Sequence, residues 1–161
     1  MSGQNPGSPL VLSYKGADPD RELLDWARAG WLGGVVLFKD NCVEESALRA
    51  AIALLRDASP HPLHVMIDEE GGRVRRLPDA PESMLDLRSY EGRSVDDVAH
   101  GYEAVARRLR ALGIDTLLAP VVDIGDPAAD WLRSRTLSDS PAGVALMARA
   151  VVAALQSTGV N

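Results

Sequence analysis

Four apolar stretches, each followed by a segment with helical periodicity, constrain the fold of this chain more than any other feature. This repeated alternation predicts an α/β fold with a parallel sheet, because each helix carries the chain back so that the next strand runs in the same direction. The expected strands are Leu10–Tyr14, Gly33–Phe38, Leu63–Ile67 and Thr116–Ile124.

Two architectures satisfy this alternation. A doubly wound sheet has helices on both faces, whereas a (β/α) barrel has every helix outside and needs eight units over roughly 250 residues. The 161 residues supply four such units, so a barrel interpretation makes the chain a partial barrel. No glycine-rich phosphate loop follows the first strand, because Lys15-Gly16-Ala17 is too sparse for a dinucleotide or P-loop fingerprint. This disfavours the doubly wound alternative and any nucleotide cofactor.

The helical segments carry start and stop signals of their own. Asp18 is expected to cap the first helix with Pro19 at its first position, and Ser94 with Asp97 resembles a capping box at the third. Apolar residues at three- and four-residue spacings give each segment a face that can pack on the sheet. The four segments are residues 18–30, 44–58, 94–113 and 140–159.

Composition excludes several classes of function. A net charge of −6, a pI near 5.0 and an aromatic content of 4% disfavour a nucleic-acid partner. No apolar run approaches the ~20 residues that span a bilayer. A single Cys42 cannot form an internal disulfide, so we expect a cytoplasmic protein. Residues 1–9, rich in Ser, Gly, Asn and Pro, are expected to form a flexible tail before one domain over residues 10–161.

The stretch from Asp68 to Leu77 contains the charged side chains that are the main candidates for binding a ligand. Asp68 is the first polar residue after the apolar run Leu63–Ile67, and the ends of parallel strands are where such sheets bind ligands. Gly71 and Gly72 let the main chain approach a ligand closely, and three arginines follow at positions 73, 75 and 76. Carboxylates and forked donors together suit a polyhydroxylated substrate.

A plainer interpretation applies to part of this stretch. Glu69 or Glu70 could pair with Arg73 or Arg76 at a solvated helix start, where acidic residues are common and exposed pairs contribute little. No ligand spacing of a recognised type supports a metal site among these acids, and we expect no cofactor.

Five segments, taken in order, resemble one known family. They are Gly33–Asn41, Ile67–Leu77, Leu112–Asp115, Ala119–Asp123 and Arg135–Pro141. This order is similar to glycoside hydrolase family 3, and within it to the bacterial β-N-acetylhexosaminidases. The resemblance implies the N-terminal half of a TIM (β/α)₈ barrel. It also implies hydrolysis of terminal β-linked N-acetylglucosamine, or a related β-glycoside, by the complete enzyme.

The same resemblance assigns residues to a carbohydrate site. It implies that Asp68 accepts hydrogen bonds from sugar hydroxyls and that Arg76 and Arg135 orient the same ring. Asp123 would line the same mouth, although a buried structural aspartate that caps the next loop is an equal alternative. For Arg135 the alternative is a surface pair with Asp139.

The sequence departs from the family pattern in two ways. Leu137-Ser138 follows Thr136 where the family has Phe-Gly, and the segment after Arg76 lacks the usual Phe-Thr start of its loop. These differences bear on the shape of the pocket.

The resemblance assigns no catalytic residue to this chain. The family's acid/base histidine lies in a Lys-His-Phe-Pro-Gly-His-Gly segment, and the 161 residues contain neither that segment nor the nucleophilic aspartate beyond it. We expect His61 and His64 at the opposite face of the barrel and His100 on a helix surface. The chain alone is expected to be inactive.

Several readings of such a chain stay open. It could be a fragment, a subunit that needs a complementary chain, a self-pairing dimer, or a non-catalytic sugar-binding or regulatory half-barrel. Four strands leave edges and an apolar face that favour association.

Overall fold

The sheet is parallel and its strands follow chain order. The computed structural model describes residues 10–78, 94–126 and 128–161, so the expected tail at residues 1–9 lies outside the described residues. The order is β1-β2-β3-β4, and every neighbouring pair is parallel. A doubly wound sheet reverses its strand order at a switch point, whereas this one steps in a single direction, as a barrel does. The strands are β1 (Leu10–Leu12), β2 (Leu32–Leu37), β3 (His64–Ile67) and β4 (Thr116–Leu117).

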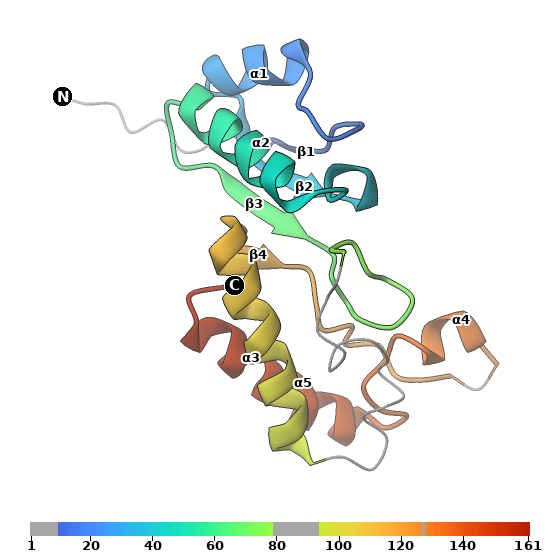
Figure 1. Cartoon of the computed structure of the whole chain (residues 1–161). Helices are drawn as coiled ribbons and strands as arrows, with labels where there is room; N and C mark the ends of the chain where they lie inside the picture. The colour runs from blue at the N-terminus through green and yellow to red at the C-terminus, as the bar shows by residue number, and fades with distance from the viewer. Residues whose placement is uncertain (1–9, 79–93, 127) are drawn as a thin grey trace.

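The helices follow one another around this sheet. Neighbouring helices along the chain contact each other, with α1 against α2, α2 against α3, and α3 against α5. Figure 1 shows α3 and α5 side by side near β4 and α1 with α2 near β1 and β2. The elements are α1 (Arg21–Arg28), the 3₁₀ turn η1 (Lys39–Asn41), α2 (Glu45–Ala58), α3 (Val95–Leu112), α4 (Asp130–Arg133) and α5 (Pro141–Ser157).

The hydrophobic core is built on the two central strands. Val35 and Leu37 of β2 and Val65 and Ile67 of β3 are completely buried. Helix residues complete this core, with Leu55 of α2 and Leu109 of α3 among the completely buried side chains. The apolar faces expected from the helical spacing therefore do pack inward. No helix in the described parts of the chain is long and apolar enough to cross a membrane.

The start of α1 differs from the expectation. Asp20, not Asp18, is the N-cap, and its carboxylate accepts a hydrogen bond from the Leu23 N–H at 2.8 Å. The helix begins at Arg21, so Pro19 precedes it rather than occupying its first position. Aspartate is a common N-cap, so Asp18 and Asp20 are both candidates from sequence. An N-cap side chain bonds the backbone N–H three residues on, and in this helix that N–H belongs to Leu23, so the cap is Asp20.

The fourth strand is also shorter than expected. We expected residues 116–124 to be extended, but β4 ends at Leu117. The Leu118 N–H still donates to the Ile67 carbonyl at 2.8 Å. Pro120 then has no N–H to offer, so the ladder cannot continue through it.

Other boundaries agree with the sequence. Ser94 and Asp97 form the expected capping box, and Gly113 ends α3 in the left-handed conformation with φ of 88°. Beyond α5 the chain returns to the sheet beside β4. The Asn161 N–H donates to the Asp115 carbonyl at 2.9 Å, and the Leu117 N–H donates to the Asn161 carbonyl at 2.8 Å. This is the bonding pattern of a parallel pair.

Candidate functional site

The candidate site is built by the loop that leaves β3. Asp68, Glu69 and Glu70 directly follow the last strand residue, Ile67. The loop then turns through Gly71 and Gly72, whose φ angles of 87° and 57° lie in the left-handed region. The Glu70 N–H donates to the Val74 carbonyl at 3.0 Å, which closes the turn. The loop therefore folds back on itself and returns Arg76 to the strand end.

Asp68 and Arg76 form a forked ion pair at this end of β3. The Arg76 Nε–H donates to Oδ1 of Asp68 at 2.7 Å, and Nη2–H donates to Oδ2 at 2.5 Å. The side chains are 19% and 23% exposed, so solvent still reaches the pair. The hydrogen bond to Asp68 raises the pKa of Arg76. The Arg76 guanidinium also lies over the Phe38 ring, 5.8 Å from its centroid.

Glu69 is completely buried and holds the end of the loop. Its Oε2 accepts hydrogen bonds from the backbone N–H of Arg76 at 2.6 Å and of Leu77 at 2.9 Å. The interpretation of Glu69 as a solvated surface residue at a helix start is therefore wrong. No helix begins here, and the carboxyl group instead replaces backbone partners that the loop lacks.

Glu70 and Arg135 form a second forked pair, which joins distant parts of the chain. The Arg135 Nε–H donates to Oε2 of Glu70 at 2.7 Å, and Nη2–H donates to Oε1 at 2.6 Å. The pairing of Glu70 with Arg73 or Arg76 that we considered is thus wrong. Two hydrogen bonds to a buried carboxylate, rather than a surface contact, fix Arg135, which also lies over the Trp131 ring.

Three of the predicted site residues thus meet at one end of the sheet, and Asp123 lies at their margin. Glu70 is the main cause of the raised pKa of Arg135, and Asp123 and Asp68 add to it through their charges. Asp123 is exposed, so the alternative of a buried structural aspartate is wrong. The arrangement presents carboxylates and forked donors on one surface, the groups that recognise hydroxyl-bearing ligands.

Sequence reasoning missed the turn η1, which borders this site. Asn41 is completely buried, and its side chain joins its own turn to the loop after β1. Its Oδ1 accepts from the Phe38 N–H at 2.7 Å, and its Nδ2 donates to the carbonyls of Tyr14 at 3.0 Å and Gly16 at 2.8 Å. A polar residue just after a buried strand was the available signal.

A pocket of about 520 Å³ lies beside Arg76. Its lining brings η1 together with the returning end of the loop, so it is continuous with the Asp68–Arg76 pair. The lining residues are Lys39, Asp40, Cys42, Val43, Arg75, Arg76, Leu77 and Pro78. In the described ranges, no three His, Cys, Asp or Glu side chains are placed to hold a metal ion.

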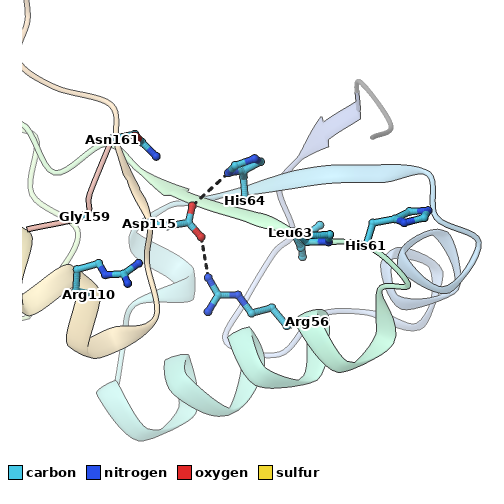
Figure 2. Close-up of a pocket in the computed structure, with 9 residues that line it drawn as sticks. Arg56, His61, Leu63, His64, Arg110, Asp115, Gly159 and Asn161 are labelled. Carbon is cyan, nitrogen blue, oxygen red and sulfur yellow. Dashed lines mark hydrogen bonds and ion pairs between the residues drawn. The ribbon is translucent and has the colours of Figure 1, made fainter. Parts of the chain in front are cut away.

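A second pocket, of about 420 Å³, is lined by residues from the opposite ends of the strands (Figure 2). Asp115 is its central acid and accepts a hydrogen bond from Arg56 at 2.7 Å and from the Val65 N–H at 3.1 Å. His64 lies 3.6 Å from the same carboxylate, and His61 lines the pocket. Both histidines therefore lie away from Asp68, as expected, and His100 is exposed on α3.

Comparison with known proteins identifies the family of this chain. A family model described as the glycosyl hydrolase family 3 N terminal domain matches residues 10–161. This chain belongs to glycosyl hydrolase family 3. A β-hexosaminidase of Xanthomonas campestris pv. campestris (strain B100) is 33% identical, and the match covers 94% of this chain and 48% of the relative. A β-hexosaminidase of Xylella fastidiosa (strain M23) is 32% identical over 157 residues, covering 93% and 47%.

Solved structures of family 3 proteins have the same fold. NagZ from Neisseria gonorrhoeae in complex with N-trifluoroacetyl-D-glucosamine superposes with a TM-score of 0.82 at 23% identity, over 96% of this chain and 48% of NagZ. LpqI of M. tuberculosis superposes with a TM-score of 0.77 at 29% identity, over 92% and 44%. This family 3 chain thus spans about half the length of the relatives that it matches. The partial-barrel expectation is confirmed as an α/β fold of this family whose sheet is not closed.

Proposed function

We propose that Asp68, Arg76 and Arg135, with Asp123 at their margin, bind the terminal sugar of a β-linked N-acetylglucosaminide or related β-glycoside. The observation that carries this proposal is the forked Asp68–Arg76 pair at the end of β3, which solvent can still reach. In an α/β barrel, ligands bind at the end of the sheet where the strands finish. The names of the relatives, β-hexosaminidases, support this class of substrate.

The pair remains chemically able to recognise a sugar although its members bind each other. Each carboxylate oxygen of Asp68 has two lone pairs, and Arg76 occupies one on each oxygen. The others can accept sugar hydroxyl protons. The Nη1 group of Arg76 makes no hydrogen bond to Asp68, so it can donate one to a sugar oxygen.

We propose that the chemistry of hydrolysis is not performed by these carboxylates. Cleavage with retention needs one group that attacks the anomeric carbon and one that protonates the leaving oxygen. Asp68 and Glu70 are each engaged by a forked arginine, and Glu69 is buried on backbone amides. The isolated 161 residues are therefore expected to bind sugar without cleaving it, while the complete enzyme hydrolyses it.

Calorimetric titration with N-acetylglucosamine tests the binding proposal. Wild-type chain should release heat on binding, Asp68→Ala should abolish it, and the exposed helix residue change Asp57→Ala should leave it unaltered. Binding that survives Asp68→Ala would place the site elsewhere, and an absence of heat from the wild type would refute binding by this chain.

Release of a chromogenic group from a β-N-acetylglucosaminide tests the catalytic proposal. The isolated chain should give no turnover, and turnover would overturn the assignment of the chemistry to other residues. A non-catalytic sugar-binding or regulatory half-barrel is the second candidate. Asp68, Glu69 and Glu70 are all hydrogen-bonded within the protein, and this suits a protein that does not cleave sugar equally well. Activity that appears when the remaining barrel strands are supplied favours the hydrolase.

We also expect this chain to associate with a complementary chain or with itself. Leu10 and Val11, on the edge strand β1, are 45% and 42% exposed. At the β4 side, Leu118 and Val122 are exposed as well. Sedimentation analysis of the chain alone should show a species larger than the monomer if it pairs with itself, and a monomer at every concentration would contradict self-association.

A further inference from the structure

Trp131, on α4, is the most exposed aromatic side chain among the described residues. It is 61% exposed. Exposure alone assigns no role to it, because single apolar side chains are common on protein surfaces. An indole ring is nevertheless a large and rigid apolar face that a ligand can cover. Its position relative to the proposed sugar site therefore decides whether it has a role there.

The Trp131 ring lies beside the proposed sugar site. The Arg135 guanidinium lies over the ring, 5.9 Å from its centroid. Arg135 is itself fixed by Glu70, which accepts its Nε–H at 2.7 Å and its Nη2–H at 2.6 Å at the end of β3. One face of the indole is thus turned to an arginine of the proposed site, and the exposure of Trp131 leaves the ring accessible from its other side.

The backbone holds Trp131 in this place. The chain leaves the end of β4, forms α4 and returns, and two contacts close the base of this excursion. Val121 and Thr136 form a parallel bridge, and the Gly125 N–H donates to the Ser138 carbonyl at 3.0 Å. Figure 1 shows α4 standing out from α3 and α5 on the side of the loop that follows β3. The ring is therefore carried by a segment with a closed base rather than by a free loop.

We infer that Trp131 forms a second sugar subsite, in which its exposed face stacks on the ring linked to the terminal sugar. A sugar ring has C–H groups on its faces and hydroxyl groups around its edge. The negative face of an indole attracts the C–H groups, and the contact removes apolar area from water. The inference rests on the proposed function, because Trp131 lies beside the second ring only if Arg135 orients the first.

Two subsites make the preferred ligand at least a disaccharide. A monosaccharide occupies only the place set by Asp68, Arg76 and Arg135, so it gains nothing from the indole. A second ring adds the stacking contact, and an aromatic contact of this kind commonly strengthens binding about fivefold. The substrate class that follows is a chain of β-linked sugars rather than a single sugar on a small leaving group.

A purely structural role for Trp131 predicts a different pattern. In that case the indole serves only to cover Arg135 and to hold its guanidinium in place. Its removal would then weaken a monosaccharide and a disaccharide by the same factor, because both contain the terminal sugar that Arg135 contacts. The ratio of the two affinities separates the two roles, whereas either affinity alone does not.

Calorimetric titration of four chains with N-acetylglucosamine and N,N′-diacetylchitobiose tests the inference. The wild type should bind the disaccharide about fivefold more tightly. Trp131→Ala should lose this preference while its monosaccharide Kd stays close to the wild-type value, and Trp131→Phe, which keeps an aromatic face, should retain most of it. Trp31→Ala is the matched control and should keep the preference. Trp31 is 55% exposed and directly precedes β2, so it lies at the opposite end of the sheet from Asp68.

Three results would overturn the second subsite. They are equal wild-type affinities for the two sugars, a preference that Trp131→Ala keeps, and an equal weakening of both sugars in Trp131→Ala. The monosaccharide still binds to the wild type in each case, so the proposed function stands. If the wild type binds neither sugar, the proposed function fails and the second subsite fails with it.

A spectrum of the wild-type chain locates the contact independently of any change in stability. The sequence contains three tryptophans, so ¹⁵N-labelled chain gives three indole N–H signals. The Trp131 signal is the one missing from Trp131→Phe, and the Trp31 signal is the one missing from Trp31→Ala. The disaccharide should shift the Trp131 signal more than the monosaccharide does and leave the Trp31 signal in place. A Trp131 signal that does not move while the disaccharide binds would refute the inference.

Discussion

Glu70 and Arg135, 65 residues apart in sequence, face each other as a forked pair with donor–acceptor distances of 2.7 and 2.6 Å. The pair ties the loop after β3 to the segment between α4 and α5. The Glu70 side chain is 7% exposed and that of Arg135 is 29% exposed. Water can therefore solvate the Glu70 carboxylate only slightly if Arg135 is removed. This tie positions Arg135 for the proposed sugar site.

Removal of Arg135 should destabilise the fold. We expect Arg135→Ala to lower the free energy of unfolding by about 3 kcal/mol, because a buried carboxylate is left without its cation. Urea denaturation monitored by circular dichroism measures the change. Arg149→Ala, an exposed arginine on α5, is the matched control and should stay within about 0.5 kcal/mol of the wild type. Equal losses from both variants would show that the forked pair contributes nothing specific.

The fork geometry at Arg76 should matter more than its charge. We expect Arg76→Lys to weaken N-acetylglucosamine binding about tenfold, because lysine keeps the charge but cannot bond both oxygens of Asp68 in one plane. Calorimetry with Arg73→Lys as the control measures the difference, since Arg73 is exposed in the same loop. Unchanged affinity in Arg76→Lys would mean that the fork does not orient the site.

Cys42 should be inert in the folded protein. Its pKa of about 12 and its 2% exposure leave roughly one thiol in ten thousand as reactive thiolate at about pH 8. Iodoacetamide labelling followed by mass spectrometry should therefore be far slower in the native chain than in denaturant. Native labelling at the rate of an unstructured cysteine would contradict the burial of this thiol.

Gly34 should tolerate no side chain. A Cβ placed there would lie 2.7 Å from the His64 carbonyl oxygen, on the strand that pairs with it. We expect Gly34→Ala to cost about 2–3 kcal/mol of unfolding free energy, because a backbone atom cannot move aside as a flexible side chain can. Gly16→Ala is a useful comparison.

Gly16 has φ of 81° and open space around the position of a Cβ, so its substitution should cost only about 1 kcal/mol from backbone strain. Thermal unfolding of the two variants compares the losses. A smaller loss in Gly34→Ala than in Gly16→Ala would show that β2 and β3 can separate without penalty.

Local sequence signals predicted the boundaries of an element well where residues within or next to that element set them. The Ser94–Asp97 capping box and the Gly113 terminator are short-range features, and the structure confirms both. The end of β4 was predicted poorly because apolar composition continues to Ile124, whereas a ladder requires donors that Pro120 does not have. Asp20 displaced Asp18 as the cap of α1 because capping depends on a single amide position.

The candidate site was predictable in its members but not in its pairing. The position of Asp68 at a strand end, together with the family resemblance, indicated the candidate site. Nothing in a linear sequence shows that three consecutive acids point to three different partners, an arginine eight residues on, two backbone amides and an arginine 65 residues on. Those partners depend on how the loop folds back and on long-range packing, which local spacing does not encode.

The buried Asn41 side chain holds two backbone segments together, the loop after β1 and the turn after β2. Its carboxamide bonds the carbonyls of Tyr14 and Gly16 and the N–H of Phe38, so it stands in for ladder contacts beyond the ends of β1 and β2. The Asn41 carboxamide therefore restricts the movement of both loops at this end of the sheet. Asn41 holds the backbone of Phe38, and the Arg76 guanidinium lies over the ring of that residue, so we expect the loop that carries this ring to keep one conformation with and without a ligand.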